Sequence, residues 1–376
     1  MRVTVQLVDA IVDRTLWAKS YDRDLTDILA IQSEVASAIA EEIRVKVTPA
    51  EQVRLQPRGP VNPVAHVAYL RGRFLWNRWT PDELRRSIEC FEEALAADPS
   101  YALAYAGLAD AYRVLGTTRT LPPGDAYPKA RAAAVKGLEL DPSSGELHAS
   151  FASIMRLDEW DWQGAEREFM RALALTPGYA DAHGRLAIHF ACLGRHGEAV
   201  AQVMRALELD PLSLITYTVV GDVLFYGRRF EESITYYRRC SEMDPSFRPA
   251  NTDLARSLEH VGRFDEALEH FRRGVARPDG AVPPSSGLAI MTWRAGLRDE
   301  AREILAEVNE LAKSRYIAPF GIASFHAVAG ETDPALDWLD ARTPSATARW
   351  YFSKCIRAST RCAASLASRR CSRSCD

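Results

Sequence analysis

The apolar positions in the middle of the chain follow a pattern that recurs after 34 residues. Ala165, Phe169 and Ala172 stand at positions i, i+4 and i+7, so they share one face of a helix, and Pro177 ends that helix. The corresponding residues of the next copy are Ala199, Val203, Ala206 and Pro211. The alanines allow a neighbouring helix to approach closely, and the larger residue between them fills the remaining space. The pattern therefore predicts helices that pack side by side.

A small residue marks the second helix of each of eight consecutive helix pairs. These residues are Ser87, Ala130, Ala165, Ala199, Ser233, Ala267, Ala301 and Ala335. Their spacings are 43, 35 and then five times 34 residues. A constant period of this length indicates a solenoid in which each two-helix repeat packs on the next. We expect an all-α superhelix of about eight repeats over residues 65–340.

Prolines and glycines mark the ends of the expected helices. In five repeats a proline follows the small marker residue after 12 positions, at Asp98-Pro99, Asp141-Pro142, Thr176-Pro177, Asp210-Pro211 and Asp244-Pro245. Because the residue before a proline disfavours the helical conformation, each pair is expected to end a second helix. Glycine readily adopts a positive φ, so the turn inside a repeat is expected at Gly194, Gly227, Gly262 and Gly296.

The second repeat has a longer connection, Thr117–Tyr127, that contains two adjacent prolines and a glycine. An insertion of this kind is a candidate binding loop, and a neutral surface insertion is the alternative.

The N-terminal residues 1–56 have a different pattern. Residues 1–22 alternate between apolar and polar positions around a break at Asp13-Arg14, which predicts a β-hairpin. The segment from Asp24 to Glu42 has apolar residues every three or four positions and predicts an amphipathic helix. Residues 57–64, rich in proline and glycine, are expected to form a linker. The hairpin edge needs a pairing partner, so self-association through this edge is possible.

The C-terminal residues 341–376 are basic and rich in cysteine. They hold seven arginines and Lys354 against a single acidic residue, Asp376. We expect a disordered basic tail, a nucleic-acid-binding arm being the alternative. The four cysteines lack paired zinc-ligand spacing, at Cys355, Cys362, Cys371 and Cys375. Codons compatible with this segment, read one base over, can encode a different ending, so we also expect a frameshift here.

The overall composition indicates a folded protein. Hydrophobic residues make up 47% of the chain and charged residues 26%, and the net charge is −3. This charge gives no general reason to bind nucleic acid or an anionic membrane. No apolar run reaches the length of a membrane span, and the N-terminal residues do not resemble a signal peptide, so we expect a cytoplasmic protein.

No sequence motif indicates catalysis, a cofactor or a metal. His183 and His189 are six residues apart, which puts them on different sides of a helix, and His183 is expected to fill a packing position. The acidic residues Asp158, Glu159 and Asp161 alternate with tryptophans, as expected for a corner between two helices rather than for an acid/base pair. We therefore predict that the chain is not an enzyme.

The remaining candidate site is the concave wall formed by the first helix of each repeat. The residues predicted to line this partner-binding groove are Asp110, Arg113, Ser153, Arg156, Ile188, Asp222, Phe225, Tyr226, Arg256, Glu259 and Trp293. A stripe of small residues at the deepest position either leaves room for a peptide or only permits tight packing. Mixed charges favour a polar peptide or a folded protein as the partner, with the aromatic residues as anchors.

Two stretches of the chain resemble known bacterial families. The 34-residue period, with its small and aromatic residues, resembles the tetratricopeptide repeat. The stretch Leu16-Trp17-Ala18 and Tyr21-Asp22-Arg23-Asp24, with the following helix, resembles the last third of a TolB-like (FlgO-like) module. In that family the module lies between a tetratricopeptide array and an effector, which is a winged-helix domain, a class III nucleotide cyclase or a kinase. Since Met1 falls inside the module, we expect a truncated reading frame.

The residues and the resemblance together suggest a non-catalytic scaffold of a signalling or transcription-regulatory protein that binds a peptide or protein. The alternatives are the regulatory portion of a cyclase, kinase or winged-helix regulator whose effector lies upstream, and a non-functional gene fragment.

Overall fold

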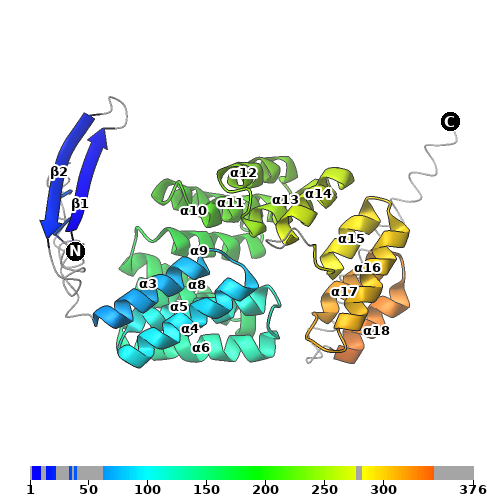
Figure 1. Ribbon diagram of the computed structural model, residues 1–376, viewed down its shortest axis with the longest axis horizontal. Coiled ribbons are helices and arrows are strands. Elements are labelled where there is room, and N and C mark those ends of the chain that lie inside the picture. The colour runs from blue at the N-terminus through cyan, green and yellow to red at the C-terminus, as the bar shows by residue number, and fades with distance from the viewer. Residues whose placement is uncertain are drawn as a thin grey trace.

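The computed structural model describes residues 2–9, 14–22, 34–35, 38–39, 62–276 and 282–342. In this part of the chain the fold is helical apart from one antiparallel hairpin near the N-terminus (Figure 1). Strand β1 (Arg2–Asp9) pairs with β2 (Arg14–Asp22), with an irregularity between Leu7 and Val8. The predicted hairpin is confirmed. Most of the predicted helix Asp24–Glu42, most of the expected linker and residues 343–376 lie outside the described residues.

Within the described residues 62–276 and 282–342, eight helix pairs follow one another, as the period predicts. Their bounds are α3 (Pro63–Trp76) with α4 (Pro81–Ala97), α5 (Ala102–Thr117) with α6 (Pro123–Leu140), α7 (Gly145–Ile154) and the π-helical turn η2 (Met155–Glu159) with α8 (Trp162–Leu175), α9 (Ala180–Cys192) with α10 (His196–Leu209), α11 (Leu214–Tyr226) with α12 (Phe230–Met243), α13 (Arg248–His260) with α14 (Phe264–Val275), α15 (Ser286–Arg294) with α16 (Arg298–Leu311), and α17 (Pro319–Val328) with α18 (Thr332–Arg342). The predicted all-α solenoid is confirmed.

The predicted helix stops are also confirmed. The five residues that precede the prolines each cap the end of a second helix, at Asp98, Asp141, Thr176, Asp210 and Asp244. In three of the repeats the aspartate accepts hydrogen bonds from the backbone and hydroxyl of a serine two residues later, as Asp98 does from Ser100 at 3.0 and 2.6 Å. Each stop is therefore fixed by local chemistry.

Two predicted loops are shorter than expected because a proline begins a helix inside each. Helix α3 starts at Pro63, within the expected linker, where Asn62 accepts a hydrogen bond from the backbone of Val64 at 3.0 Å. Helix α6 starts at Pro123, within the expected loop Thr117–Tyr127. Proline suits the first turn of a helix because its missing N–H would have no partner there. The connection in the second repeat is therefore shorter than predicted, and a binding role for it stays a prediction.

Every repeat turns through one residue with a positive φ. These residues are Trp79, Arg119, Trp160, Gly194, Arg228, Gly262, Gly296 and Gly330. Glycine was expected at 227 in the fifth repeat, but Gly227 has a φ of −75° and Arg228 has the positive value of 59°. The prediction for Gly227 is wrong because the turn needs its left-handed residue one position later. Residues other than glycine pay a conformational cost of about 1–2 kcal/mol there.

Two of these bulky turn residues contact repeats much further along the chain. Trp79 of the first repeat packs against the cluster formed by Cys240, Phe247 and Ala250 of the fifth and sixth repeats. The guanidinium of Arg119 in the second repeat lies 4.7 Å from the ring centroid of Phe320 in the eighth. These side-chain contacts show that separate parts of the array touch one another.

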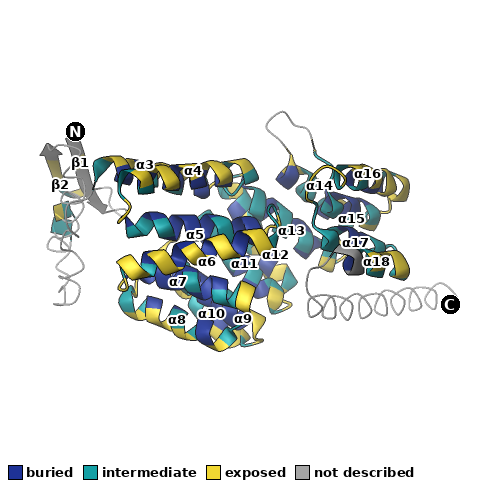
Figure 2. Ribbon diagram, turned by 90° about the horizontal axis from the view of Figure 1, so that it is seen from below, coloured by how far each residue is buried: buried dark blue, intermediate teal, exposed yellow. Residues whose placement is uncertain are grey.

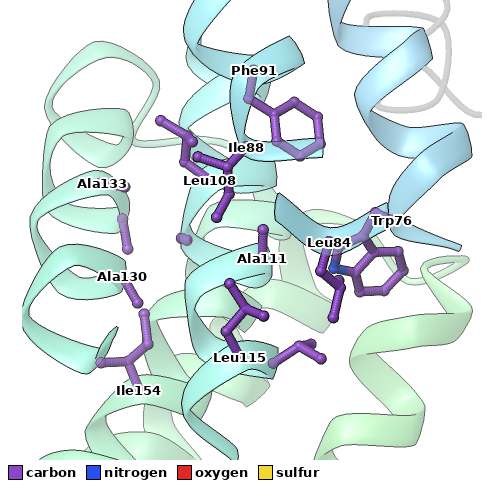
Figure 3. Close-up of a cluster of buried hydrophobic side chains, with 13 residues drawn as sticks. Trp76, Leu84, Ile88, Phe91, Leu108, Ala111, Leu115, Ala130, Ala133 and Ile154 are labelled. Carbon is purple, nitrogen blue, oxygen red and sulfur yellow. The ribbon is translucent and has the colours of Figure 1, made fainter. Parts of the chain in front are cut away.

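The core forms where the helices of successive repeats meet. Figure 3 shows the largest N-terminal cluster, in which Phe91 and Leu84 of α4 face Leu108 and Leu115 of α5. Phe91 is fully buried, and Gly72 of α3 and Gly107 of α5 lie against its ring. Figure 2 shows buried residues along α5 and exposed residues along the outward face of α6. Among the described helices none is both long and apolar enough to cross a membrane.

Replacing Arg228 with glycine should stabilise the protein, because it removes the cost of a left-handed arginine from an exposed turn. We expect Arg228→Gly to raise the thermal midpoint by roughly 1–3 °C, and the matched Gly262→Arg to lower it by a similar amount. Differential scanning calorimetry measures both. A decrease for Arg228→Gly would show that its side chain contributes more than the turn costs.

Candidate partner-binding groove

The first helices of successive repeats form an inner layer. Helix α5 contacts α7, α7 contacts α9, α9 contacts α11 and α11 contacts α13. Residues on the inward side of this layer therefore approach one another across repeats that are far apart in sequence. The groove residues predicted from the sequence lie on these helices or on η2 and α15, and the structure divides them into distinct groups.

In the second to fourth repeats a buried ion pair occupies the inner side. The guanidinium of Arg185 makes two hydrogen bonds to the carboxylate of Asp110, at 2.7 and 2.6 Å, across 75 positions of sequence. Ser150 donates a third hydrogen bond to Asp110 at 2.9 Å, and Asp181 binds the same arginine at 2.5 Å. Asp110 and Arg185 are only 2% and 8% exposed. A ligand would have to displace Arg185 to reach Asp110.

The charges of this cluster alter the titration of its members. Burial alone would raise the pKa of Asp110, but Arg185 and then Arg113 hold it well below its ordinary value. Burial, and then the charge of Arg185, lower the pKa of Arg113, whose side chain is 13% exposed. Ser153 is also buried and donates its hydroxyl to the carbonyl of Ala149 at 2.9 Å. This part of the predicted groove is largely filled by its own side chains.

A second polar cluster, in the fifth and sixth repeats, is more open. Asp222 accepts hydrogen bonds from the Tyr237 hydroxyl at 2.7 Å and from the Arg256 guanidinium at 2.9 Å. The Asp222 and Arg256 side chains are 25% and 36% exposed. The same guanidinium lies 4.3 Å from the ring centroid of Phe225 and 3.4 Å from a carboxylate oxygen of Asp253. The structure thus brings together Asp222, Phe225 and Arg256, three of the predicted groove residues.

Aromatic rings extend this cluster along the groove. Phe225 lies 4.9 Å from His260 and 5.3 Å from Phe230, measured between ring centroids. Tyr226 is adjacent to Phe225 and is 43% exposed, and burial of its hydroxyl raises its pKa to about 12. Ile188 is partly buried against the core of the third to fifth repeats. Tyr226 therefore presents the most accessible apolar surface of this group.

The third repeat contains a π-helical turn that places Arg156 in the inner layer. The spacing of 35 rather than 34 residues in this repeat supplies one extra residue, and helix α7 accommodates it as η2. Such turns are common at functional sites. Arg156 lies in η2, and its guanidinium is 3.9 Å from the sulfur of Cys192, an exposed free thiol.

The last two predicted groove residues are engaged within the array. Glu259 forms an ion pair with Arg294 at 3.0 Å. The ring centroid of Trp293 lies 5.5 Å from that of Phe325 in the following repeat, and Arg298 and Arg302 approach its ring at 5.1 and 5.2 Å. These residues connect the sixth, seventh and eighth repeats rather than joining the cluster at Phe225.

His183 and two of the acidic residues that the sequence analysis considered for chemistry have structural partners, and His148 and Asn251 occupy positions equivalent to that of His183. His148, His183 and Asn251 occupy equivalent positions and each lies within hydrogen-bond distance of the prolyl carbonyl six residues earlier. Of the acidic residues near Trp160, Asp161 accepts a hydrogen bond from the backbone of Gly164 at 2.8 Å, and Glu159 pairs with Arg131 at 3.2 Å. The side chains of the described residues form no group of three or more that could hold a metal ion.

Comparison with known proteins identifies the repeat. The family model for the tetratricopeptide repeat matches residues 157–213 and 221–282. A putative adenylate cyclase 3 from Rhizobium meliloti (strain 1021) is 37% identical over 111 residues, which is 29% of this chain and 18% of that protein. The transcriptional regulator HilA of Salmonella typhimurium is 24% identical over 145 residues, which is 39% of this chain and 26% of HilA. The matched segments thus span only a minor part of either relative.

One solved structure agrees with this assignment of the fold. Human IFIT1, in a dimer with PPP-AAAA, superposes with a TM-score of 0.50 at 17% identity and covers 83% of this chain and 77% of that one. Yeast Tom70 superposes with a TM-score of 0.48 at 18% identity and covers 78% of this chain and 64% of that one. The 34-residue period, the stacked helix pairs and the match to the family model show that the chain has the fold of a tetratricopeptide-repeat solenoid.

Proposed function

We propose that this chain is a non-catalytic scaffold that captures a peptide or protein partner on the inner side of its repeat array. The observation that carries the proposal is the open cluster of Phe225, Tyr226 and Arg256. It combines exposed aromatic surface with a guanidinium that is held in place by two carboxylates. Aromatic residues and arginine dominate the binding energy of protein interfaces, so this cluster is the best anchor among the predicted groove residues.

The partner surface extends from this cluster toward the third repeat. The buried network around Asp110 leaves little room in the second to fourth repeats, so Asp110, Arg113 and Ser153 act mainly as support for the groove wall. Arg156, Ile188 and Tyr226 form the part of the wall that a partner reaches. Glu259 and Trp293 border the same surface on its C-terminal side.

The setting we propose is a bacterial signalling or transcription-regulatory protein. The sequence matches to a putative adenylate cyclase and to a transcriptional regulator support a regulatory setting, as does the resemblance of residues 1–56 to a TolB-like module. We place the scaffold in the cytoplasm, with the repeat array at residues 65–340 as the partner-binding unit. Among the described residues the β1–β2 sheet has two strands, and we propose that its edge adds a contact with a second copy.

The double variant Phe225→Ala/Arg256→Ala should lose partner capture, because it removes the aromatic surface and the charge together. We expect an increase in Kd of roughly 30-fold or more for a partner isolated with the full chain and measured by calorimetry. The matched control is Met170→Ala/Arg171→Ala on the exposed side of α8. Tyr226→Ala tests the same surface without leaving Asp222 unpaired. Unchanged binding by Tyr226→Ala and the double variant, at unchanged helicity, would place the interface elsewhere.

The cluster also changes charge close to neutral pH. Burial raises the pKa of Asp253 to about 7, while Arg256 opposes this shift and the Asp222 carboxylate adds to it. In the unfolded chain an aspartate loses its proton near pH 4. Between these values the folded protein binds more protons than the unfolded one, so the free energy of unfolding falls as the pH rises.

Replacing Asp253 with asparagine should remove much of the decrease in the free energy of unfolding between pH 5 and pH 8. We expect wild-type protein to be less stable at pH 8 than at pH 5, and Asp253→Asn to gain about 1–2 kcal/mol over wild type at pH 8. Urea denaturation at both pH values measures the effect. An equal pH slope in the two proteins would show that Asp253 is ionised throughout this range.

A further inference from the structure

A stripe of exposed apolar side chains runs along helix α3 of the first repeat. Val64, Val67, Leu70 and Phe74 stand three or four positions apart, so they share one side of the helix, and each is between 43% and 62% exposed. Between α3 and α4 this side forms a groove of about 660 Å³, and the thiol-bearing residue Cys90 of α4 is part of its lining. The terminal repeats of a solenoid normally present a polar outer face, so the stripe indicates that another segment covers it.

A glycine contact aligns helix α3 with the first helices of later repeats. Gly72 of α3 lies against the ring of Phe91, and Gly221 of α11 lies in the same way against the ring of Tyr237. Phe91 and Tyr237 each follow the small marker residue of their repeat by four positions, which makes the two contacts equivalent. Position 74 of α3 therefore corresponds to Val223 of α11, two residues after the glycine.

At the positions aligned with the stripe, the fourth to sixth repeats bury their side chains. Val223 is 1% exposed and packs in one cluster with residues of α9 and α10, which form the preceding repeat. The equivalents of Phe74 one period to either side, and the three equivalents of Val67, are also buried: His189, Ser257, Ala182, Thr216 and Ala250. The exposed stripe of α3 is thus the surface on which a preceding helix packs in the interior of the array.

The sequence before α3 contains a segment with a matching apolar pattern. Residues 24–43 place Ile28, Ile31, Val35 and Ile39 three or four positions apart, and the described residues of this segment, 34–35 and 38–39, are helical. Residues 44–61 connect the segment to the start of α3. These 18 residues can span about 60 Å, whereas the 14 residues of α3 extend over about 21 Å, so the segment can reach any part of the stripe.

Charge favours the same pairing. Residues 24–43 contain five acidic residues and no basic one: Asp24, Asp27, Glu34, Glu41 and Glu42. Helix α3 contains no acidic residue, and three arginines border its stripe. Arg71 and Arg86 line the groove, and the guanidinium of Arg78 lies 5.0 Å from the centroid of the aromatic ring at the end of the stripe. Glu89 and Glu93, which also line the groove, lie on α4, so the α3 side keeps its positive charge.

We propose that residues 24–43 dock as a helix on the α3 stripe and cap the N-terminal end of the array. The apolar side of the segment takes the place that a preceding repeat takes at the later helices, and its acidic residues lie beside the arginines at the edge of the stripe. The docked helix joins the β1–β2 hairpin to the first repeat, so that the N-terminal residues and the array form one unit. This surface is separate from the groove at Phe225, and the proposal does not depend on partner capture there.

Hydrogen exchange of the full chain, measured by mass spectrometry, tests the docking. We expect the amides of residues 28–43 to exchange at least about ten-fold more slowly than in the unfolded chain, because an isolated helix of this length is marginal in water. Phe74→Asp should accelerate their exchange at least about five-fold, since it removes apolar contact area and adds a negative charge next to an acidic segment. Leu70→Asp is a second variant of the same stripe. The matched control is Leu212→Asp, at an exposed apolar residue between α10 and α11.

The same data show whether the array stays folded, because the exchange of helices α9 to α14 should be equal in all of these proteins. Fast exchange of residues 28–43 in the wild type would overturn the proposal. Equal protection in the wild type and both stripe variants would overturn it as well, since another surface would then hold the segment. Protection that rises with protein concentration would assign the stripe to a second copy and so contradict docking within one chain.

A reciprocal experiment changes the segment and measures access to the stripe. The thiol introduced by Phe74→Cys should react with a maleimide at least about five-fold faster when Val35→Asp/Ile39→Asp is added, because the segment no longer covers it. The thiol introduced by Leu212→Cys is the matched control and should react at one rate in both backgrounds. An equal rate at position 74 with and without the two changes in the segment would overturn the proposal.

Discussion

The buried ion pair between Asp110 and Arg185 is the constraint around which the N-terminal half of the array is arranged. It joins the second repeat to the fourth through two short hydrogen bonds, and Ser150 of the repeat between them completes the set. A charged side chain as buried as Asp110, which is 2% exposed, is tolerated only when it is paired and hydrogen-bonded. Helices α5, α7 and α9 must therefore hold their relative positions for the cluster to exist. The pair therefore fixes the curvature of these repeats and fills the inner side, which leaves the open surface to the later repeats.

The tight winding has a second source in the turn residues. Trp79 and Arg119 take a conformation that glycine adopts at lower cost, and their side chains reach repeats that are several units away. Contacts between distant repeats are unusual in a solenoid, whose units normally touch only their neighbours. Here the backbone cost at the turn is offset by apolar burial of Trp79 and by the stacking of Arg119 on Phe320.

Much of the fold could be predicted from the sequence because the period, the helix stops and the hairpin depend on neighbouring residues. The turn at Arg228 could not be predicted, because the residue with a positive φ is Arg228 rather than the preceding Gly227. The groove was predictable only as a set of inward positions. Its filled part depends on Arg185, which reaches Asp110 across 75 positions of sequence only because the superhelical curvature brings the second and fourth repeats together. The spacing of residues along the chain does not reveal the curvature of the superhelix.

A double-mutant cycle on Asp110 and Arg185 tests this account most directly. With Asp110→Ala, Arg185→Ala and the double variant, the free energy of unfolding measured in urea should show a coupling of about 2–3 kcal/mol, because each single change leaves a buried charge without the two hydrogen bonds of this pair. The double variant should then be no less stable than either single variant. Additive losses, with coupling near zero, would contradict the claim that this ion pair sets the arrangement of the inner layer.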